Sequence, residues 1–209
     1  VGVIHAVIVE AVNGAAYALS RVSRSGLFRK TYLPSLGMND LAPLATNLVH
    51  FTGYEIPVDN IRVESRLDLQ LGYLLGTADL LAQLSDRCYL EKCRDRLYPE
   101  FVLGGLAKPG AAGSDNDVYT SAENLLERTP QFFRASVQVR LDKSFEKTHL
   151  LESVYFDGNT PYMNAILKNI AYLESLIAKG SFDDLRREPP YTQGEDAFPY
   201  PVVDIEDRS

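Results

Sequence analysis

The chain is poor in cysteine and lacks tryptophan altogether. Among its 209 residues the only cysteines are Cys88 and Cys93. Both lie in one predicted helix, where their side chains diverge around the helix axis and cannot easily form a disulfide. Buried free thiols are typical of a reducing compartment, so we expect a cytoplasmic protein.

An excess of positive charge is absent as well. The chain carries 21 Lys and Arg residues against 28 Asp and Glu residues, which gives a formal net charge of −7. Binding along a nucleic-acid backbone requires clustered lysine and arginine, so this balance argues against an extended nucleic-acid surface. Polar residues and glycines interrupt the longest apolar stretch, residues 69–84, which argues against a membrane span.

Several catalytic motifs are also missing. The sequence contains no GxxxxGK[ST], GxGxxG, GxSxG, CxxC or HExxH. Phosphate-binding loops, dinucleotide-binding folds, serine-hydrolase nucleophile elbows and the common zinc sites therefore have no sequence support. The composition itself, 45% hydrophobic and 23% charged, is that of a globular domain able to bury a sizeable core.

The spacing of apolar residues predicts an all-α fold, a single bundle of about six or seven helices without a convincing pair of strands. We assign residues 1–186 to this domain and residues 187–209 to an extended acidic tail that contains prolines. The predicted helices cover residues 3–22, 41–49, 68–97, 122–128, 130–141 and 161–177, and residues 54–65 and 104–117 are expected to connect them.

Glycine and proline set the predicted helix boundaries. Gly26 should end the first helix and Gly180 the last, because glycine favours the left-handed conformation that follows a helix. Pro99 should end the long helix, which we expect to bend near Arg87. Thr129-Pro130 should begin a new helix, because proline is tolerated in a first turn.

The longest predicted helix carries the clearest apolar stripe of the sequence. Helical spacing places these apolar residues on one side of it, and we expect that side to face the core. The stripe consists of Leu71, Leu74, Leu75, Ala78, Leu81 and Ala82.

Asp79 needs an explanation because leucines surround it in the most apolar part of this helix. A buried carboxylate must be paired, bound to a cation or protonated. Either Asp79, Gln83 and Asp86 form an ordinary polar stripe on the solvent edge of the helix, or they line an inward-facing groove. In the second interpretation, Arg87 and Glu91 lie at the end of the groove. Periodicity alone leaves both open.

The residues around Asp79 resemble a known motif. The run GTADLL from residue 76, which continues to Arg87, is similar to the late helix motif of the HD superfamily of metal-dependent phosphohydrolases. In that motif an Ala-Asp pair followed by leucines supplies the last aspartate ligand of the metal. One helix earlier, Leu48-Val49-His50 resembles the place where many HD proteins carry an additional histidine. The resemblance covers roughly residues 39–96 and, more weakly, the final helix.

The resemblance implies an all-helical fold that holds one divalent cation or a pair of them, of Mn, Mg, Fe or Zn. Asp79 would be a metal ligand, and His50 a second metal ligand or a phosphate contact. The family also uses a first histidine and an adjacent His-Asp pair, yet this chain contains no His-Asp dipeptide. Either that portion precedes Val1, or the protein is a degenerate member that keeps the scaffold without the metal.

These expectations lead to two main classes of function. A phosphohydrolase would act on a nucleotide or another small phosphoester, with Arg87 and Lys92 neutralising the phosphate and Gln83 and Asp86 lining the substrate groove. A non-catalytic regulatory or ligand-sensing module would reuse the scaffold, as a homodimer or within a longer signalling chain, and would bond Asp79 to a protein donor. A third candidate is an interaction protein that binds its partner through the acidic tail.

Overall fold

A computed structural model describes residues 14–110 and 118–188, with side chains from Val22 onward. This part of the chain is mostly helical and contains no β-strand, only an isolated parallel bridge between Ala107 and Tyr119. The predicted all-α fold class is therefore confirmed. Residues 1–13, 111–117 and 189–209, which include the start of the first predicted helix and most of the predicted tail, lie outside the described residues.

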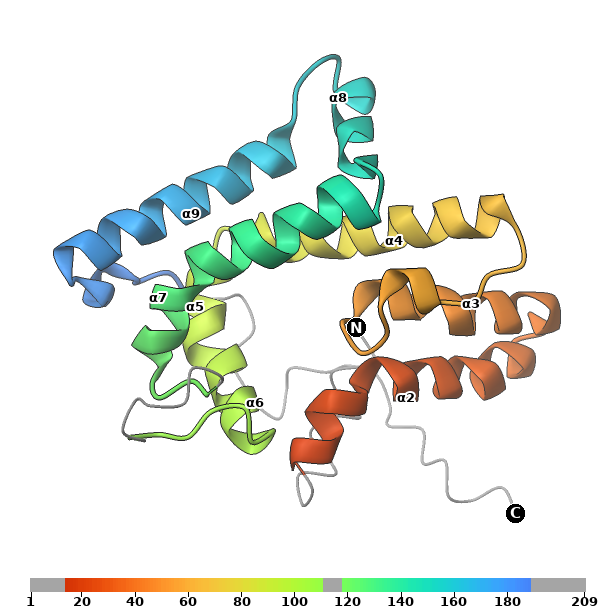
Figure 1. Cartoon of the computed structure of the whole chain (residues 1–209), viewed down its shortest axis with the longest axis horizontal. Helices are drawn as coiled ribbons and strands as arrows, with labels where there is room; N and C mark the ends of the chain where they lie inside the picture. The colour runs from red at the N-terminus through yellow and green to blue at the C-terminus, as the bar shows by residue number, and fades with distance from the viewer. Residues whose placement is uncertain (1–13, 111–117, 189–209) are drawn as a thin grey trace.

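The first layer of the molecule consists of two helices packed against each other (Figure 1). Helix α2 spans Gly14–Ser35, helix α3 spans Ala42–Leu48, and the 3₁₀ turn η3, Val49–Thr52, continues α3 up to Gly53. The predicted helix over residues 41–49 is confirmed.

The prediction that Gly26 ends the first helix was wrong, since α2 continues to Ser35. A Cβ atom at position 26 would lie 3.1 Å from the backbone oxygen of Thr46 in α3. The glycine therefore lets two helices approach closely and does not terminate one of them.

Helix α4, Arg66–Leu84, crosses the middle of the molecule (Figure 1). Ser65 caps its N-terminus by accepting a hydrogen bond of 3.1 Å from the backbone N–H of Asp68. The helical run is interrupted after Leu84, close to the bend predicted near Arg87. It resumes as α5, Tyr89–Lys92, the π-turn η5, Cys93–Leu97, and α6, Tyr98–Leu103.

Pro99 does not end this run, as the sequence had predicted, but lies in the first turn of α6. In the preceding π-turn the backbone N–H of Tyr98 bonds to the oxygen of Cys93, one residue farther back than in an α-helix. The wider turn gives the proline ring the room that a regular helix would deny it.

The face that α4 turns toward the core is the reverse of the predicted one. Leu71, Leu74 and Leu75 are 37%, 44% and 41% exposed, and of the predicted leucine stripe only Leu81 is buried. The buried face instead carries Gly72 and Gly76. A Cβ atom on Gly72 would lie 2.5 Å from the Phe51 ring, and one on Gly76 would lie 2.5 Å from the Phe145 ring. The glycines form a flat seat for two aromatic rings, which explains why this side packs inward.

The second half of the chain is a bent helical run followed by a hairpin. Helix α7, Ala122–Phe132, continues through π-turns at Phe133–Val137 and Arg140–Ser144, and α8 and α9 follow at Leu151–Tyr155 and Pro161–Lys179. Pro130 does not begin a new helix as predicted but lies inside α7, and the run changes direction after it (Figure 1). The predicted boundaries of α9 are confirmed, with Gly180 left-handed after its last turn.

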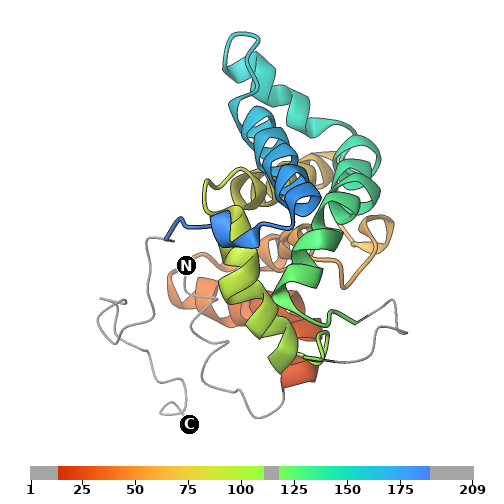
Figure 2. The same cartoon turned by 90° about the vertical axis from the view of Figure 1, so that its left-hand side faces the viewer.

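Two hydrophobic clusters hold these elements together. One joins α4 to η3, the Phe133–Phe145 run and α9, and the other joins α5 and α7 to the C-terminal half of α9. The chain then turns back, and Leu185, 3% exposed, enters the second cluster. Residues 182–188 cross α5 as a strap (Figure 2). None of the described helices combines the length and the apolar character that crossing a bilayer requires.

Candidate functional site around Asp79 and Arg140

Asp79 lies on α4 and is half-buried. The amide nitrogen Nε2 of Gln83, one turn later, donates a hydrogen bond of 2.8 Å to its oxygen Oδ2. The structure therefore brings together two of the predicted site residues, at the spacing that the sequence indicated.

Arg140 is a buried cation within electrostatic reach of Asp79, and it comes from the far end of the bent run that starts with α7. It is only 7% exposed. Its nitrogen Nη2 donates to the backbone oxygens of Phe51, at 3.0 Å, and Gly53, at 2.5 Å. The carbon Cζ lies 4.3 Å from the ring centre of Tyr54, in cation–π geometry. One guanidinium group thus fixes the loop that follows η3.

The charges of this cluster influence one another. Burial lowers the pKa of Arg140 below its ordinary value, while the Tyr54 hydroxyl and the Asp79 carboxylate act in the opposite direction. Burial raises the pKa of Tyr54, which the positive charge of Arg140 partly offsets. Asp79 therefore supplies negative charge within electrostatic reach of a buried cation, as buried charges require.

His50, the other predicted metal ligand, lies on η3, the turn that packs against α4. It is half-buried, and its ring nitrogen Nδ1 is shielded from solvent without a hydrogen-bond partner in the structure. An imidazole nitrogen of this kind retains a lone pair or a proton for a further contact.

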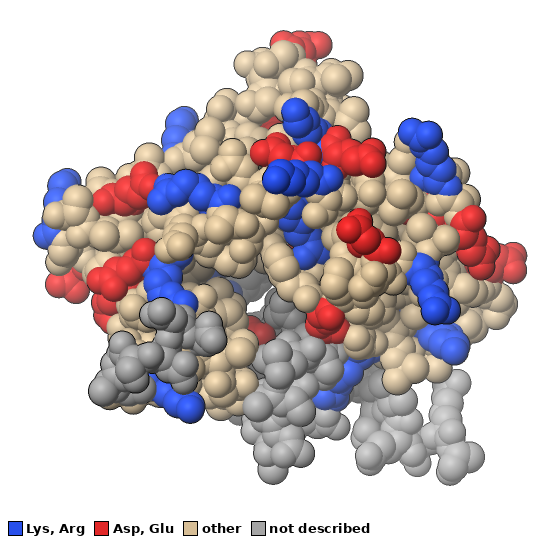
Figure 3. All heavy atoms as spheres, in the orientation of Figure 1, with Lys and Arg blue, Asp and Glu red and all other residues tan. Residues whose placement is uncertain are grey.

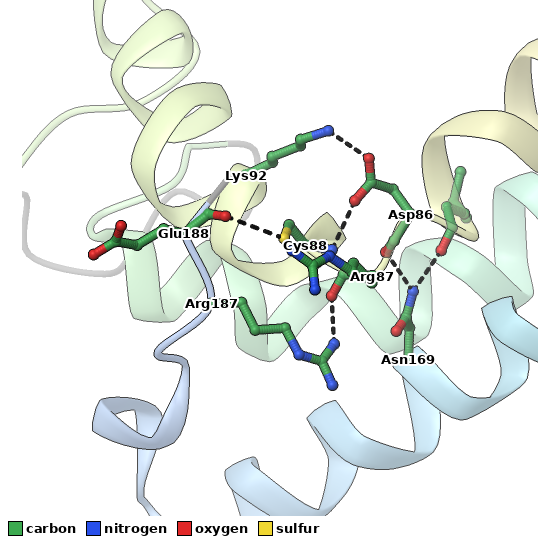
Figure 4. Close-up of polar contacts among 8 residues, drawn as sticks. Asp86, Arg87, Cys88, Lys92, Asn169, Arg187 and Glu188 are labelled. Atoms are coloured by element: carbon green, nitrogen blue, oxygen red, sulfur yellow. Dashed lines mark hydrogen bonds and ion pairs between the residues drawn. The ribbon is translucent and has the colours of Figure 1, made fainter. Parts of the chain in front are cut away.

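The remaining predicted site residues form a separate group at the break between α4 and α5 (Figure 4). Asp86 accepts a hydrogen bond of 2.7 Å from the backbone N–H of Cys88 and one of 2.5 Å from Lys92 Nζ. Burial alone would raise the pKa of Asp86, but the bonds from Lys92 and Cys88 lower it below the ordinary value. Asn169 of α9 donates to the backbone oxygens of Leu84 and Asp86, which ties the break to the hairpin.

Arg87 is exposed, and its backbone oxygen accepts a hydrogen bond from the side chain of Arg187 (Figure 4). The predicted phosphate-binding residues therefore divide by role. Lys92 is paired with Asp86, and Arg87 anchors the C-terminal strap through its backbone. On the face shown in Figure 3, lysine and arginine side chains are interspersed with aspartate and glutamate.

Sequence reasoning missed Arg140, and it placed Glu91 at the end of the groove without predicting that this carboxylate is buried. Arg140 follows Phe133 and Val137 at helical spacing, so an arginine at a core-facing position was the available signal. Glu91 is 2% exposed and accepts a hydrogen bond of 3.2 Å from the backbone N–H of Arg187. The available signal for the burial of Glu91 was its place between the apolar residues Leu90 and Cys93.

The donors around Asp79 fit a catalytic divalent cation poorly. In the part of the chain that the structure describes, no three His, Cys, Asp or Glu side chains come together as a set of metal ligands. A carboxylate and an imidazole alone bind such ions weakly, and the positive charge of Arg140 acts on the same carboxylate. Comparison of the chain with protein-family models, curated proteins and solved structures yields no match.

Proposed function

We propose that this chain is a non-catalytic regulatory module built on an HD-type helical scaffold, in which Asp79 serves as the counter-charge of Arg140. The observation that carries the proposal is the buried guanidinium of Arg140, which lies within electrostatic reach of Asp79. A positive charge at this place takes the role that a metal ion has in the phosphohydrolases which the sequence resembles.

The surroundings of Arg140 support this role. Its bonds to the oxygens of Phe51 and Gly53 hold the guanidinium in place, so its charge stays beside α4. Two like charges repel, and more strongly in a partly buried site than in water, so a cation at Asp79 would have to overcome this repulsion.

A regulatory role is also supported by what α4 presents to its surroundings. Leu67, Leu71, Leu74 and Leu75 lie on its outer side and are all substantially exposed. Exposed apolar patches of this kind mark surfaces for other proteins or chain segments. The two free, buried thiols fit a reducing location such as the cytoplasm.

His50 favours a second candidate, a metal-dependent phosphohydrolase. Its shielded Nδ1 has no hydrogen-bond partner and lies on a turn packed against α4. In this candidate Asp79 and His50 would hold part of the ion's ligand set, and Arg87 or Lys92 would contact a phosphoester.

Thermal melting with added Mn²⁺, Mg²⁺, Zn²⁺ or Fe²⁺ tests the two candidates. An ion at a hundred times its dissociation constant stabilises the folded state by about 2.7 kcal/mol, enough to raise the melting temperature by about 5 to 10 °C. We expect no such rise. We expect Asp79→Asn to lower stability by about 1 kcal/mol because Arg140 loses its counter-charge, whereas the exposed control Asp59→Asn should leave stability unchanged.

The opposite pattern would establish the phosphohydrolase candidate. An ion would then raise the melting temperature of the parent chain and of Asp59→Asn. It would fail to do so for Asp79→Asn and for His50→Gln.

A further inference from the structure

A cleft of about 390 Å³ lies between α4 and residues 146–154, and this volume is in the range of small-molecule sites. Residues 146–154 include the 3₁₀ turn η8, Thr148–Leu150, which packs against α4, and most of α8, which rises from η8 (Figure 1). We refer to this space as the α4–α8 cleft. One wall includes Gln70 and Tyr73 of α4, and the other includes Glu146, Lys147, Leu150, Leu151 and Val154.

The turn before η8 has an unusual backbone. Glu146 and Lys147 both have positive φ angles, 48° and 60°, although neither residue is a glycine. The backbone N–H of Lys147 donates a hydrogen bond of 3.0 Å to the oxygen of Leu141, which holds the turn in this shape. Residues with a strained backbone of this kind gather at ligand sites, because the surrounding structure fixes them there. The turn thus holds a carboxylate and an ammonium group side by side at the cleft.

These two charges form no side-chain hydrogen bond or ion pair within the part of the chain that the structure describes. Tyr73, on the opposite wall, is held by its packing against the rings of Phe51 and Phe145, whose centres lie 6.0 Å and 5.8 Å away. Burial raises the pKa of Tyr73, and the negative charge of Glu146 raises it further. The two side chains are therefore within electrostatic reach, and both have oxygen atoms that can accept a hydrogen bond from a cation.

Aliphatic side chains complete the second wall of the cleft. Leu150, Leu151 and Val154 are 51%, 53% and 76% exposed, so their apolar surface is open to a ligand. The cleft therefore offers an acceptor for a cation, a donor for an anion and an apolar wall beside them. The ammonium, carboxylate and side chain of an aliphatic α-amino acid match these three features.

We propose that the α4–α8 cleft binds a free aliphatic α-amino acid of the leucine type. The ammonium group of the ligand lies between the carboxylate of Glu146 and the hydroxyl of Tyr73, and its carboxylate contacts Lys147. Its side chain packs against the aliphatic wall. Only the regulatory meaning of this binding rests on the proposed function, because the cleft includes neither Asp79 nor Arg140.

Calorimetric titration of the full chain with L-leucine tests the proposal. Glu146→Gln and Lys147→Met should each weaken binding about tenfold or more, because each removes a charged partner of the ligand. The matched control, Glu127→Gln with Lys168→Met, makes the same chemical changes at exposed positions outside the cleft and should leave the affinity unchanged. The absence of any binding of L-leucine to the parent chain would overturn the proposal.

Two analogues of leucine assign each contact separately. N-acetyl-L-leucine lacks the ammonium group, so Glu146→Gln should not weaken its binding, and L-leucinamide lacks the carboxylate, so Lys147→Met should not weaken its binding. If Glu146→Gln weakened the binding of L-leucine and N-acetyl-L-leucine equally, the carboxylate would not contact the ammonium group and the proposal would be wrong. The same holds for Lys147→Met with L-leucine and L-leucinamide.

A glycine variant guards against misfolding as the cause of lost binding. Glycine adopts positive φ angles without strain, so Glu146→Gly with Lys147→Gly should fold and melt no lower than the parent chain. It should nevertheless fail to bind L-leucine, and binding with the affinity of the parent chain would overturn the proposal. This proposal and the proposed function can fail separately, because the melting test with divalent cations concerns Asp79 and the titration with leucine concerns the cleft.

Discussion

Helices α4 and α9 are alike in length and apolar content but opposite in how they pack. Each has 19 residues and is rich in leucine or isoleucine. In α9 the large residues Ile166, Ile170, Leu173 and Leu176 are buried at helical spacing. In α4 the glycine face is buried and much of the leucine stripe is exposed. Periodicity therefore identifies the two sides of a helix, but the shape of the neighbouring residues decides which side packs inward.

Truncating one leucine in each helix gives the largest expected contrast. Leu173 is fully buried, so Leu173→Ala should lower the free energy of unfolding by about 2 to 5 kcal/mol, because it leaves a cavity. Leu74→Ala on the exposed side of α4 should cost less than about 0.5 kcal/mol. Urea denaturation measures both. Similar losses would show that α4 buries its leucine stripe.

Arg140→Met tests whether the guanidinium group fixes the loop after η3, which packs against α4. It removes the donor to the oxygens of Phe51 and Gly53, and leaving these acceptors unsatisfied should cost about 2 to 4 kcal/mol. Hydrogen exchange should accelerate more in α4 than in α9. The control is Arg134→Met in the same helical run, which breaks only an exposed ion pair with Glu174 and should change stability little. An equal effect of the two substitutions would refute this role for Arg140.

Gly76→Ala should lower the stability of the fold, although the same substitution in an ordinary helix raises it. In an ordinary helix alanine is favoured over glycine by about 1 kcal/mol. Here the added Cβ would lie 2.6 Å from the backbone oxygen of Phe51, so we expect a net loss of about 1 to 3 kcal/mol. Ala82→Gly, on the exposed side of α4, should show only the ordinary loss. A gain in stability for Gly76→Ala would mean that the glycine face is not packed.

The second hydrophobic cluster, which contains Cys93 of η5, should weaken at high pH. Burial raises the pKa of Cys93 from 9.0 to about 11, opposed in part by a hydrogen bond with Tyr89. Between these values the unfolded chain loses the thiol proton and the folded chain keeps it, so the free energy of unfolding falls as pH rises, by about 1 to 2 kcal/mol in all. Cys93→Ala should lose less stability over this range than the parent chain. Identical slopes in urea denaturation would contradict the assigned pKa.

The sequence was a good guide where local signals sufficed. Glycine and proline at its ends defined α9, and a spacing of one helical turn placed Gln83 beside Asp79. It failed where a contact joins distant segments. The residues around Asp79 in the sequence do not predict that Arg140 lies within its electrostatic reach. Those around Gly26 do not predict its close approach to Thr46. These arrangements follow from which surfaces fit together, which periodicity does not encode.

The π-turns at Cys93–Leu97 and Phe133–Val137 have a consequence for engineering the chain. Each accommodates roughly one residue more than an α-turn, which rotates everything downstream by about 100° about the helix axis. Deleting one residue inside such a turn would barely shorten the helix. It would, however, rotate all later side chains about the helix axis, so that they no longer face the neighbours they have now. Arg140 lies about one turn beyond the second of these sites. The direction of its side chain toward the loop after η3 therefore depends on the one additional residue in that π-turn.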